Sequence, residues 1–283
     1  MSKRRLFLFM ILAAISATGI AGQTPQLVKR TITKTDRFDF GSGGTVAVTG
    51  APNGSIRITA GQKNEIEITA TIELRAASTA DLDKLADVTG FVTDESIGRV
   101  GIVSMGTHSK QMLKKARKKL PKNLFGLPFR IDYVISVPRY CDLEIDGGSG
   151  DLSIAGVEGS MRVNFLETNA KVEVISGAAT VTIGKGSLNA AIGTRGWRGR
   201  SVTLQVATGD MTVHLPTNLS AEIDATILRT GKIENTFPDL KPRDRKIGFT
   251  DKAIFAKAGV GGAPLKFSVG DGALKTERLV LPF

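Results

Sequence analysis

The stretch Gly147–Val163, GGSGDLSIAGVEGSMRV, decides the fold class because it contains two copies of one short pattern. In GSGDLSI and again in VEGSMRV, a turn of glycine and a small polar residue precedes an apolar–polar–apolar triplet. Alternation of this kind is typical of β-strands, whose successive side chains point to opposite faces. The two copies are either one hairpin or the visible part of a longer repeat.

Comparable triplets recur along the chain, which favours the repeat. They begin at Leu143, Leu152, Met161, Val172, Val181, Ala190, Val202, Met211 and Ala221, at steps of 9 to 12 residues. A unit this short cannot bury its apolar face alone, so it must stack on copies of itself. Gly, Asn and Asp at the intervening turns tolerate the backbone conformations that tight corners require. The sequence therefore predicts an all-β protein, specifically a β-solenoid with two or three short strands per coil.

The N-terminal half departs from this repeat. Alternating segments at 45–48, 55–59, 65–74 and 100–105 predict strands, and ADLDKLADV at 80–88, preceded by Ser78, predicts one short capped helix. A basic insertion, KQMLKKARKKLPKN, follows at 110–123. We expect residues 23–126 to form a β-rich segment that caps the solenoid. Residues 127–283 are expected to form the repeat itself, with the last strands as the second cap.

The first 22 residues resemble a secretory signal peptide. Lys3, Arg4 and Arg5 form a basic start, Leu6–Ile15 is an apolar run, and small residues follow to Gly22. This apolar run is too short to span a membrane, and we expect no transmembrane segment in the mature chain. The sequence thus predicts export to the periplasm or the cell exterior. Cys141, the only cysteine, is expected to be a buried and inert residue.

Two basic segments are the candidate binding sites. The corner GTRGWRGRS, at 193–201, carries Arg195, Trp197, Arg198 and Arg200, and the basic insertion carries Lys114, Lys115, Arg117 and Lys118. Arginine pairs with carboxylates and phosphates, and tryptophan stacks on sugar rings. The formal net charge of +11, which falls to +8 without the three basic residues of the leader, also favours an anionic glycan or an envelope surface. Nucleic acid is not expected, because aromatic residues do not alternate with the basic ones.

The chain also resembles a known family. YVISVPRYCDLEIDGGSGDLSIAGVEGSMRV at 133–163, VTLQVATGDMTVHLP at 202–216 and GGAPLKFSVGDGALK at 261–275 are similar to the bacterial "putative adhesin" family. The likeness extends over about residues 45–281, with the basic insertion as a departure. The resemblance implies an exported β-solenoid domain of unknown function without an established catalytic role.

Other functions find less support in the sequence. Calcium-binding repeats need acidic oxygens in register, but only Asp151 and Asp210 hold the Gly-Asp position. His108 and His214 are the only histidines, and with the lone cysteine they make a weak zinc set. We therefore expect no metal and no cofactor. The expected function is non-catalytic binding or a structural role in the cell envelope; the alternative is a polysaccharide lyase or hydrolase on the same scaffold. The ligand and the oligomeric state are left open.

Overall fold

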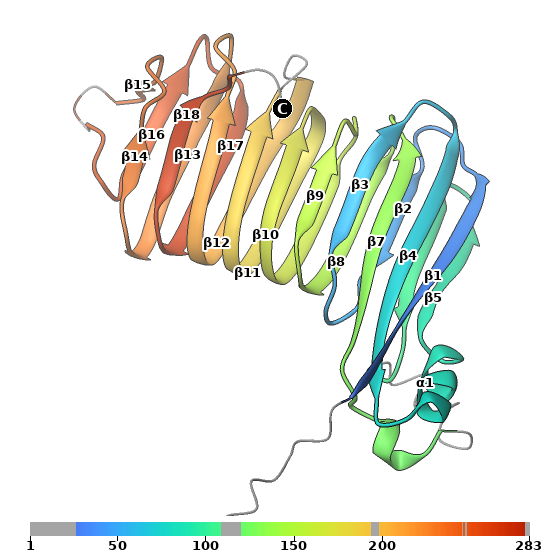
Figure 1. The fold of residues 1–283 in the computed structure, drawn as a ribbon. Helices are drawn as coiled ribbons and strands as arrows, with labels where there is room; N and C mark the ends of the chain where they lie inside the picture. Colours follow the sequence, from blue (N-terminus) through green and yellow to red (C-terminus); the bar gives the residue numbers. More distant parts are fainter. Residues whose placement is uncertain (1–26, 109–119, 194–197, 245, 247, 281–283) are drawn as a thin grey trace, which may run out of the picture.

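The protein is built almost entirely from β-strands, with one short helix (Figure 1). The computed structural model describes residues 27–108, 120–193, 198–244, 246 and 248–280. Within these residues, eighteen strands are linked into one continuous sheet. The predicted all-β class is confirmed. The leader at 1–22 and most of the basic insertion lie outside the described residues. No helix in the described part of the chain has the length and apolar character needed to cross a membrane.

The elements follow one another in this order. The first half contains β1 (Val28–Asp39), β2 (Thr45–Thr49), β3 (Ile56–Gly61), β4 (Glu65–Ala76), α1 (Thr79–Ala86), β5 (Gly90–Ser96), β6 (Arg99–Met105), a 3₁₀ turn η1 (Lys122–Leu124) and β7 (Phe129–Pro138). The second half contains β8 (Asp142–Ser149), β9 (Leu152–Ala155), β10 (Met161–Val174), β11 (Ser176–Ile192), β12 (Arg198–Leu215), β13 (Ala221–Thr230), β14 (Ile233–Asn235), β15 (Lys241–Pro242), β16 (Ala253–Ala258), β17 (Ala263–Asp271) and β18 (Leu274–Arg278).

The strands of the repeat pair in parallel at a regular offset. Met161 of β10 lies opposite Leu143 of β8 on one side and opposite Ala179 of β11 on the other, an offset of 18 residues each time. The second half of β10 pairs with β9 in the same way, with Val172 opposite Ile154. Each 18-residue unit therefore contributes one strand segment to each of two rows of strands, and two of the predicted triplets make one unit.

The two rows can be followed from one end of the molecule to the other (Figure 1). Row one runs β5, β6, β2, β8, the first half of β10, of β11 and of β12, then β17, β13, β16 and β15. Row two runs β1, β4, β7, β3, β9, the second half of β10, of β11 and of β12, then β18 and β14.

The core lies between the rows and is filled by aligned aliphatic side chains. One line of register partners in row one consists of Val100, Val46, Leu143, Met161, Ala179, Val202, Leu265 and Ile223, and all of them are buried. Every second residue of a strand faces inward, so each unit places its apolar side chains on those of the next. Burial of aliphatic area between neighbouring units, at about 25 cal/mol per Å², is the main stabilising contribution.

One corner of the stack is lined by glycines. Gly54, Gly150, Gly186, Gly209, Gly272 and Gly231 occupy equivalent places, and each has a positive φ of 122° to 148°. A Cβ on Gly209 would lie 1.8 Å from the carbonyl oxygen of Gly186 in the adjacent unit. The corner therefore requires glycine both for its backbone conformation and for the close approach of neighbouring backbones. The unit of β10 has Thr168 here instead, buried and with an ordinary φ.

The final strands do not form the cap that the sequence suggested. β17 pairs in parallel with β12 on one side and with β13 on the other, so the last full unit in the sequence lies inside the stack. Similarly, β2 and β3 lie between β6 and β7 on one side and β8 and β9 on the other. Strands on both sides of residue 126 thus share one sheet. The ends of the stack are instead β1 with β5, and β14 with β15.

Two local expectations are confirmed. Helix α1 begins after Ser78, whose hydroxyl accepts a hydrogen bond from the Asp81 backbone at 3.2 Å, and it buries Leu82 and Leu85. Cys141 is buried, and burial raises the pKa of its thiol to about 12. At neutral pH the thiol is therefore protonated and a poor nucleophile. The sequence did not indicate β1 as a strand, and its physical reason is taken up in the Discussion.

Candidate functional site

The predicted binding residues fall mostly outside the described part of the chain. This applies to Arg195, Trp197, Lys114, Lys115, Arg117 and Lys118. Arg198 and Arg200 are described, and both lie exposed at the start of β12. Between them the ladder to β11 is irregular, because Gly199 faces Gly177 but Ser201 faces Ala178. Arg200 is thus the extra residue of a β-bulge, a feature that turns a side chain away from the regular ladder.

Arg198 belongs to a cluster centred on a buried carboxylate. The side chain of Glu158 is only 4% exposed, and its Oε2 lies 2.9 Å from Nη2 of Arg198. Its Oε1 accepts hydrogen bonds from Arg139, at 2.7 Å from Nε and also from Nη2. Both arginines are partly exposed, at 39% for Arg139 and 64% for Arg198. One buried anion therefore fixes two cations that face solvent.

The backbone places Glu158 in this position. The residue lies in the turn between β9 and β10, and its N–H donates to the carbonyl oxygen of Arg139 at 2.7 Å. Gly159 follows directly, and a Cβ on it would lie 2.0 Å from the carbonyl oxygen of Cys141. Because only glycine permits this approach, the turn packs closely on the preceding unit. Hydrogen bonds from a charged acceptor with this geometry are stronger than neutral ones, and Glu158 raises the pKa of Arg139.

An aromatic ring completes the cluster. Tyr140 is 53% exposed, and the guanidinium carbon of Arg139 lies 5.5 Å from its ring centroid, within the range of cation–π contact. We call Arg139, Tyr140, Glu158 and Arg198 the Glu158 corner. With Glu158 ionised and Tyr140 neutral, these four residues carry a net charge of +1. The corner can pair with an anion while presenting a flat ring beside it.

Sequence reasoning identified Arg198 but missed the other members. Glu158 was expected to be one of several scattered outward acids, and in the structure it is buried at the centre of the cluster. The repeat itself held the missing signal. Arg139, Glu158 and Arg198 all occupy the same corner in successive units, so an alignment on the 18-residue period would have placed them together.

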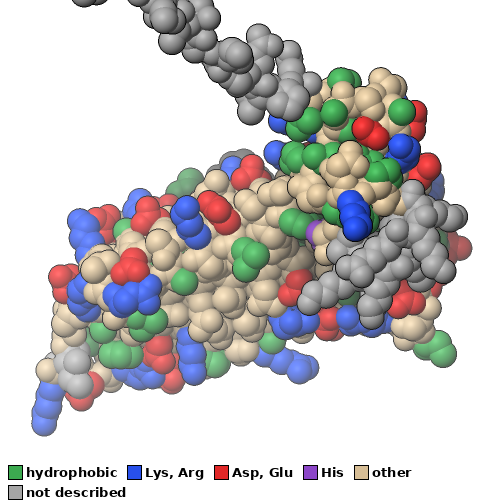
Figure 2. All heavy atoms as spheres, turned by 90° about the horizontal axis from the view of Figure 1, so that it is seen from below, with side chains coloured by type: hydrophobic (Ala, Val, Ile, Leu, Met, Phe, Trp, Pro, Cys, Tyr) green, Lys and Arg blue, Asp and Glu red, His purple; other side chains and the backbone are tan. Residues whose placement is uncertain are grey.

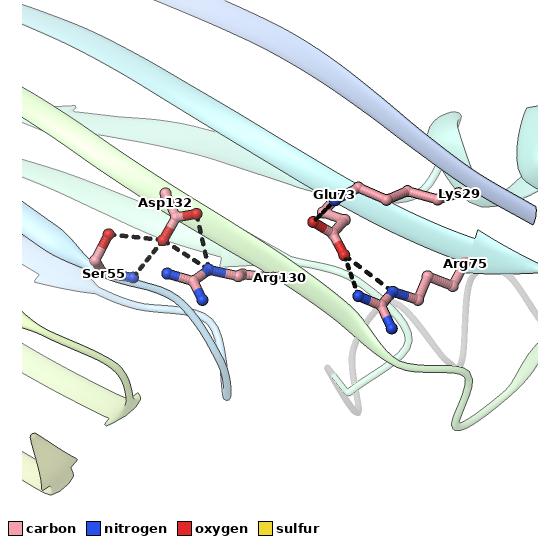
Figure 3. A network of polar contacts seen from close by, with 6 residues as sticks. All are labelled: Lys29, Ser55, Glu73, Arg75, Arg130 and Asp132. Carbon is pink, nitrogen blue, oxygen red and sulfur yellow. Dashed lines mark hydrogen bonds and ion pairs between the residues drawn. The ribbon is translucent and has the colours of Figure 1, made fainter.

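A second polar cluster lies on the outer face of row two, near the other end of the stack (Figure 3). Asp132 of β7 accepts hydrogen bonds from Arg130 at 2.8 Å and from the Ser55 hydroxyl at 2.6 Å. Partial burial pushes the pKa of Asp132 up, but the bonds from Arg130 and Ser55 outweigh it and leave the pKa lowered. Asp132 therefore stays ionised and held between two neighbouring strands.

Glu73 forms the other half of this cluster. It receives Lys29 at 2.6 Å and Arg75 at 2.7 Å, and those two hydrogen bonds lower its pKa (Figure 3). Glu73 lies opposite Arg130 in the β4–β7 ladder, so the two halves adjoin, and a small hollow lies between them. Each carboxylate here is already matched by cations, and this cluster has no exposed aromatic residue comparable to Tyr140.

The other acids of the repeat are also engaged one by one. Glu144 lies 2.7 Å from Arg99 and 3.6 Å from Arg162, and Glu173 accepts a bond from the Gly156 backbone at 2.8 Å. Figure 2 shows cationic and anionic side chains interspersed along the visible flank of the stack. Among the described residues, no group of three or more His, Cys, Asp and Glu side chains is arranged to hold a metal ion.

Two polar residues of the repeat differ from expectation. His214 was expected to be solvated, but it is only 8% exposed, because β18 packs beside β12 and brings Glu277 to 3.1 Å from its Nδ1. Burial lowers the pKa of His214 despite the nearby Glu277. Asp210 was expected to bond its own turn. Its Oδ1 instead accepts from the Ala273 backbone of the adjacent unit at 2.8 Å.

Comparisons with known proteins give only distant similarities. No family model and no curated protein matches the chain. A "putative cell adhesion protein" from Clostridium sporogenes is 12% identical with a TM-score of 0.46, covering 88% of this chain and 100% of that one. A "putative adhesin" from Bacteroides fragilis is 11% identical with a TM-score of 0.42, covering 87% and 97%. A "putative lipid binding protein" from Parabacteroides distasonis is 10% identical with a TM-score of 0.26, covering 87% and 97%.

Proposed function

We propose that this protein is an exported, non-catalytic β-solenoid that binds an anionic polysaccharide of the cell envelope through the Glu158 corner. The solenoid is supported by parallel ladders at an 18-residue offset and by the buried line of register partners from Leu143 to Ile223. Such a stack is rigid and presents regularly spaced side chains, which suits it to a long, repetitive ligand.

The arrangement of Arg139, Tyr140 and Arg198 around buried Glu158 is the observation that carries the proposal. An uronic acid offers a carboxylate and a sugar ring side by side. The guanidinium groups suit the carboxylate, and the exposed phenol ring suits the apolar face of the sugar. Because Glu158 already holds both arginines in place, less side-chain entropy is lost on binding than with free arginines. Arg200, displaced by the bulge beside Arg198, supplies a further cation.

Export and the lack of catalysis rest on separate grounds. Export is supported by the basic start, apolar run and small residues of the leader. A non-catalytic role is supported by the state of the acids in the repeat. Glycoside hydrolysis requires two carboxyl groups set apart across a bound sugar, whereas Glu144, Glu158 and Glu173 are each bonded to arginines or to backbone.

Retention on polygalacturonate, a polymer of uronic acid, tests the proposal. We expect Arg198→Gln to weaken binding about fivefold to tenfold, as expected for one charge-assisted hydrogen bond. Arg229→Gln is the matched control, because Arg229 is similarly exposed at 58% but pairs with Asp271 at the opposite corner of the stack. Methyl-esterified polygalacturonate, which lacks the charge, should bind neither protein well. Equal losses in the two variants would show general charge attraction and would refute the site.

A further inference from the structure

The two ends of the stack differ in how their strand edges are protected. At one end, β14 has three residues and β15 has two, one of which is Pro242. Short edge strands and proline prevent the pairing of further strands. At the other end, β1 has twelve residues and β5 has seven, and neither contains proline. Among the described strands, β1 pairs only with β4, and β5 only with β6. This end therefore presents two long free edges.

A groove separates these two edges. One hollow of about 540 Å³ is lined by residues 34–36 of β1 and 91–93 of β5, and a second of about 430 Å³ continues along residues 39–44 and 95–100. The printed hydrogen bonds across the groove involve side chains. Lys34 Nζ donates to the Thr89 carbonyl at 3.0 Å, and the Thr93 hydroxyl lies 3.5 Å from Asp36 Oδ2. The groove has the length of an extended peptide segment.

The free side of β1 can be identified from its pairing. Phe40 N–H donates to the Asn64 carbonyl, in continuation of the β1–β4 register. In an antiparallel pair, alternate residues direct both backbone groups to the same side. Even-numbered residues of β1 therefore bond to β4, and Thr33, Thr35 and Arg37 direct their N–H and C=O groups to the free edge. These are the groups to which an added strand would bond.

The charge around the groove selects the occupant. Asp39, Asp94 and Glu95 are exposed, and no ion pair joins them to any other described residue. Arg37, the nearby cation, is taken by Glu65 at 2.5 Å and by Glu67 at 3.3 Å, and these acids raise its pKa. The groove is thus locally acidic on a chain whose net charge is +11. Complementary charge favours a cationic segment.

We propose that the β1–β5 end of the stack binds an extended, lysine- or arginine-rich segment of a partner protein, which adds as a strand to the free edge of β1. The acidic side chains attract the segment, and the backbone of Thr33, Thr35 and Arg37 supplies the ladder. The protein then has two binding surfaces of opposite charge: the Glu158 corner for an anionic polymer and the β1 edge for a cationic peptide.

Binding of labelled decapeptides, measured by fluorescence polarisation, tests this proposal. The probes are alternating Lys-Thr and alternating Glu-Thr peptides. Thr35→Pro removes one N–H from the free edge without touching the β4 ladder, and Thr35→Ala is its matched control because it keeps the N–H. We expect the Lys-Thr peptide to bind the native protein and Thr35→Ala at least about tenfold more tightly than the Glu-Thr peptide. Thr35→Pro should weaken its binding about fivefold or more.

Three results would overturn the proposal. The first is equal binding by Thr35→Pro and Thr35→Ala, because strand addition requires the N–H. The second is equal binding of the two peptides. The third is self-association of the native chain in sedimentation that Thr35→Pro abolishes, since the occupant would then be a second copy. Thermal melting of both variants checks that β1 stays folded. The Arg198→Gln variant should bind the Lys-Thr peptide normally, so failure here is distinguishable from failure of the Glu158 corner.

Discussion

Glu158 and Arg198 lie 40 residues apart in the sequence, yet the buried carboxylate of one is 2.9 Å from the guanidinium of the other. The contact reaches across the unit of β11, because Arg198 N–H also bonds to the Ile175 carbonyl at 3.3 Å. The pair therefore ties together three units of the stack at their corner. Arg139 adds a further tie on the other side of Glu158.

Replacing Glu158 should affect stability more than replacing either arginine. In Glu158→Gln the two guanidinium groups lose their shared anion, and we expect the free energy of unfolding to fall by about 1–3 kcal/mol. Arg198→Gln should cost less, because Arg139 still pairs with the carboxylate. Urea denaturation of the single and double variants checks this through a double-mutant cycle. Additive losses would contradict a coupled cluster.

Substitution in the glycine corner should be strongly destabilising. Gly209→Ala places a Cβ 1.8 Å from the Gly186 carbonyl oxygen and requires alanine at a φ of +127°. We expect a loss of more than about 3 kcal/mol in the free energy of unfolding, since strain and a steric clash add together. Gly41→Ala is the control, because its Cβ would have no atom within 4 Å and its φ is not positive. Similar losses in both variants would contradict the close approach at this corner.

The sequence predicted the interior of the stack well for physical reasons. A triplet such as Val181–Ile183 states which face of a strand is buried, and the 9-residue step states how often the chain turns. Together they indicate aligned apolar side chains and glycine corners. Neither states which strand is the neighbour, however. The placement of β17 between β12 and β13 therefore could not be read from residues that alternate equally well at an end or in the middle.

Strand β1 shows a second limit of pattern reasoning. Its inward-facing positions include Lys34 and Asp36 beside Ile32 and Phe38, so the alternation of apolar and polar residues is broken. Polar residues are tolerated inward there because the end of the stack is open to solvent at the groove. Similarly, Glu158 was predicted to be exposed because a lone glutamate is normally solvated, and only the folded corner supplies its two arginines.

The interior position of β17 gives a direct test of the strand order. Phe267 is 1% exposed and lies between Leu204 of β12 and Ala225 of β13. We expect Phe267→Ala to lower the free energy of unfolding by about 3–5 kcal/mol, as for a core aromatic. Phe255→Ala, on the outer face of β16 at 43% exposure, should cost about 1 kcal/mol or less. Denaturant titration distinguishes the two. A small loss at Phe267 would indicate a terminal cap strand instead.

Asp271 should show an acid-dependent contribution to stability. Hydrogen bonds from Arg229 and from the Thr230 hydroxyl, at 2.7 Å for the latter, lower its pKa from an ordinary 3.8 to about 2. Because the pKa is lower in the folded state, the contribution is fully present above about pH 4 and is lost as the pH falls towards 2. NMR titration of the side-chain carboxyl carbon should give a midpoint near 2, and Arg229→Gln should move it back towards 3.8. An unchanged midpoint in Arg229→Gln would show that Thr230 alone holds the carboxylate. Because Asp271 and Arg229 lie at the corner opposite Glu158, the shift should leave binding at the Glu158 corner unchanged, so the same variant serves as the control for both measurements.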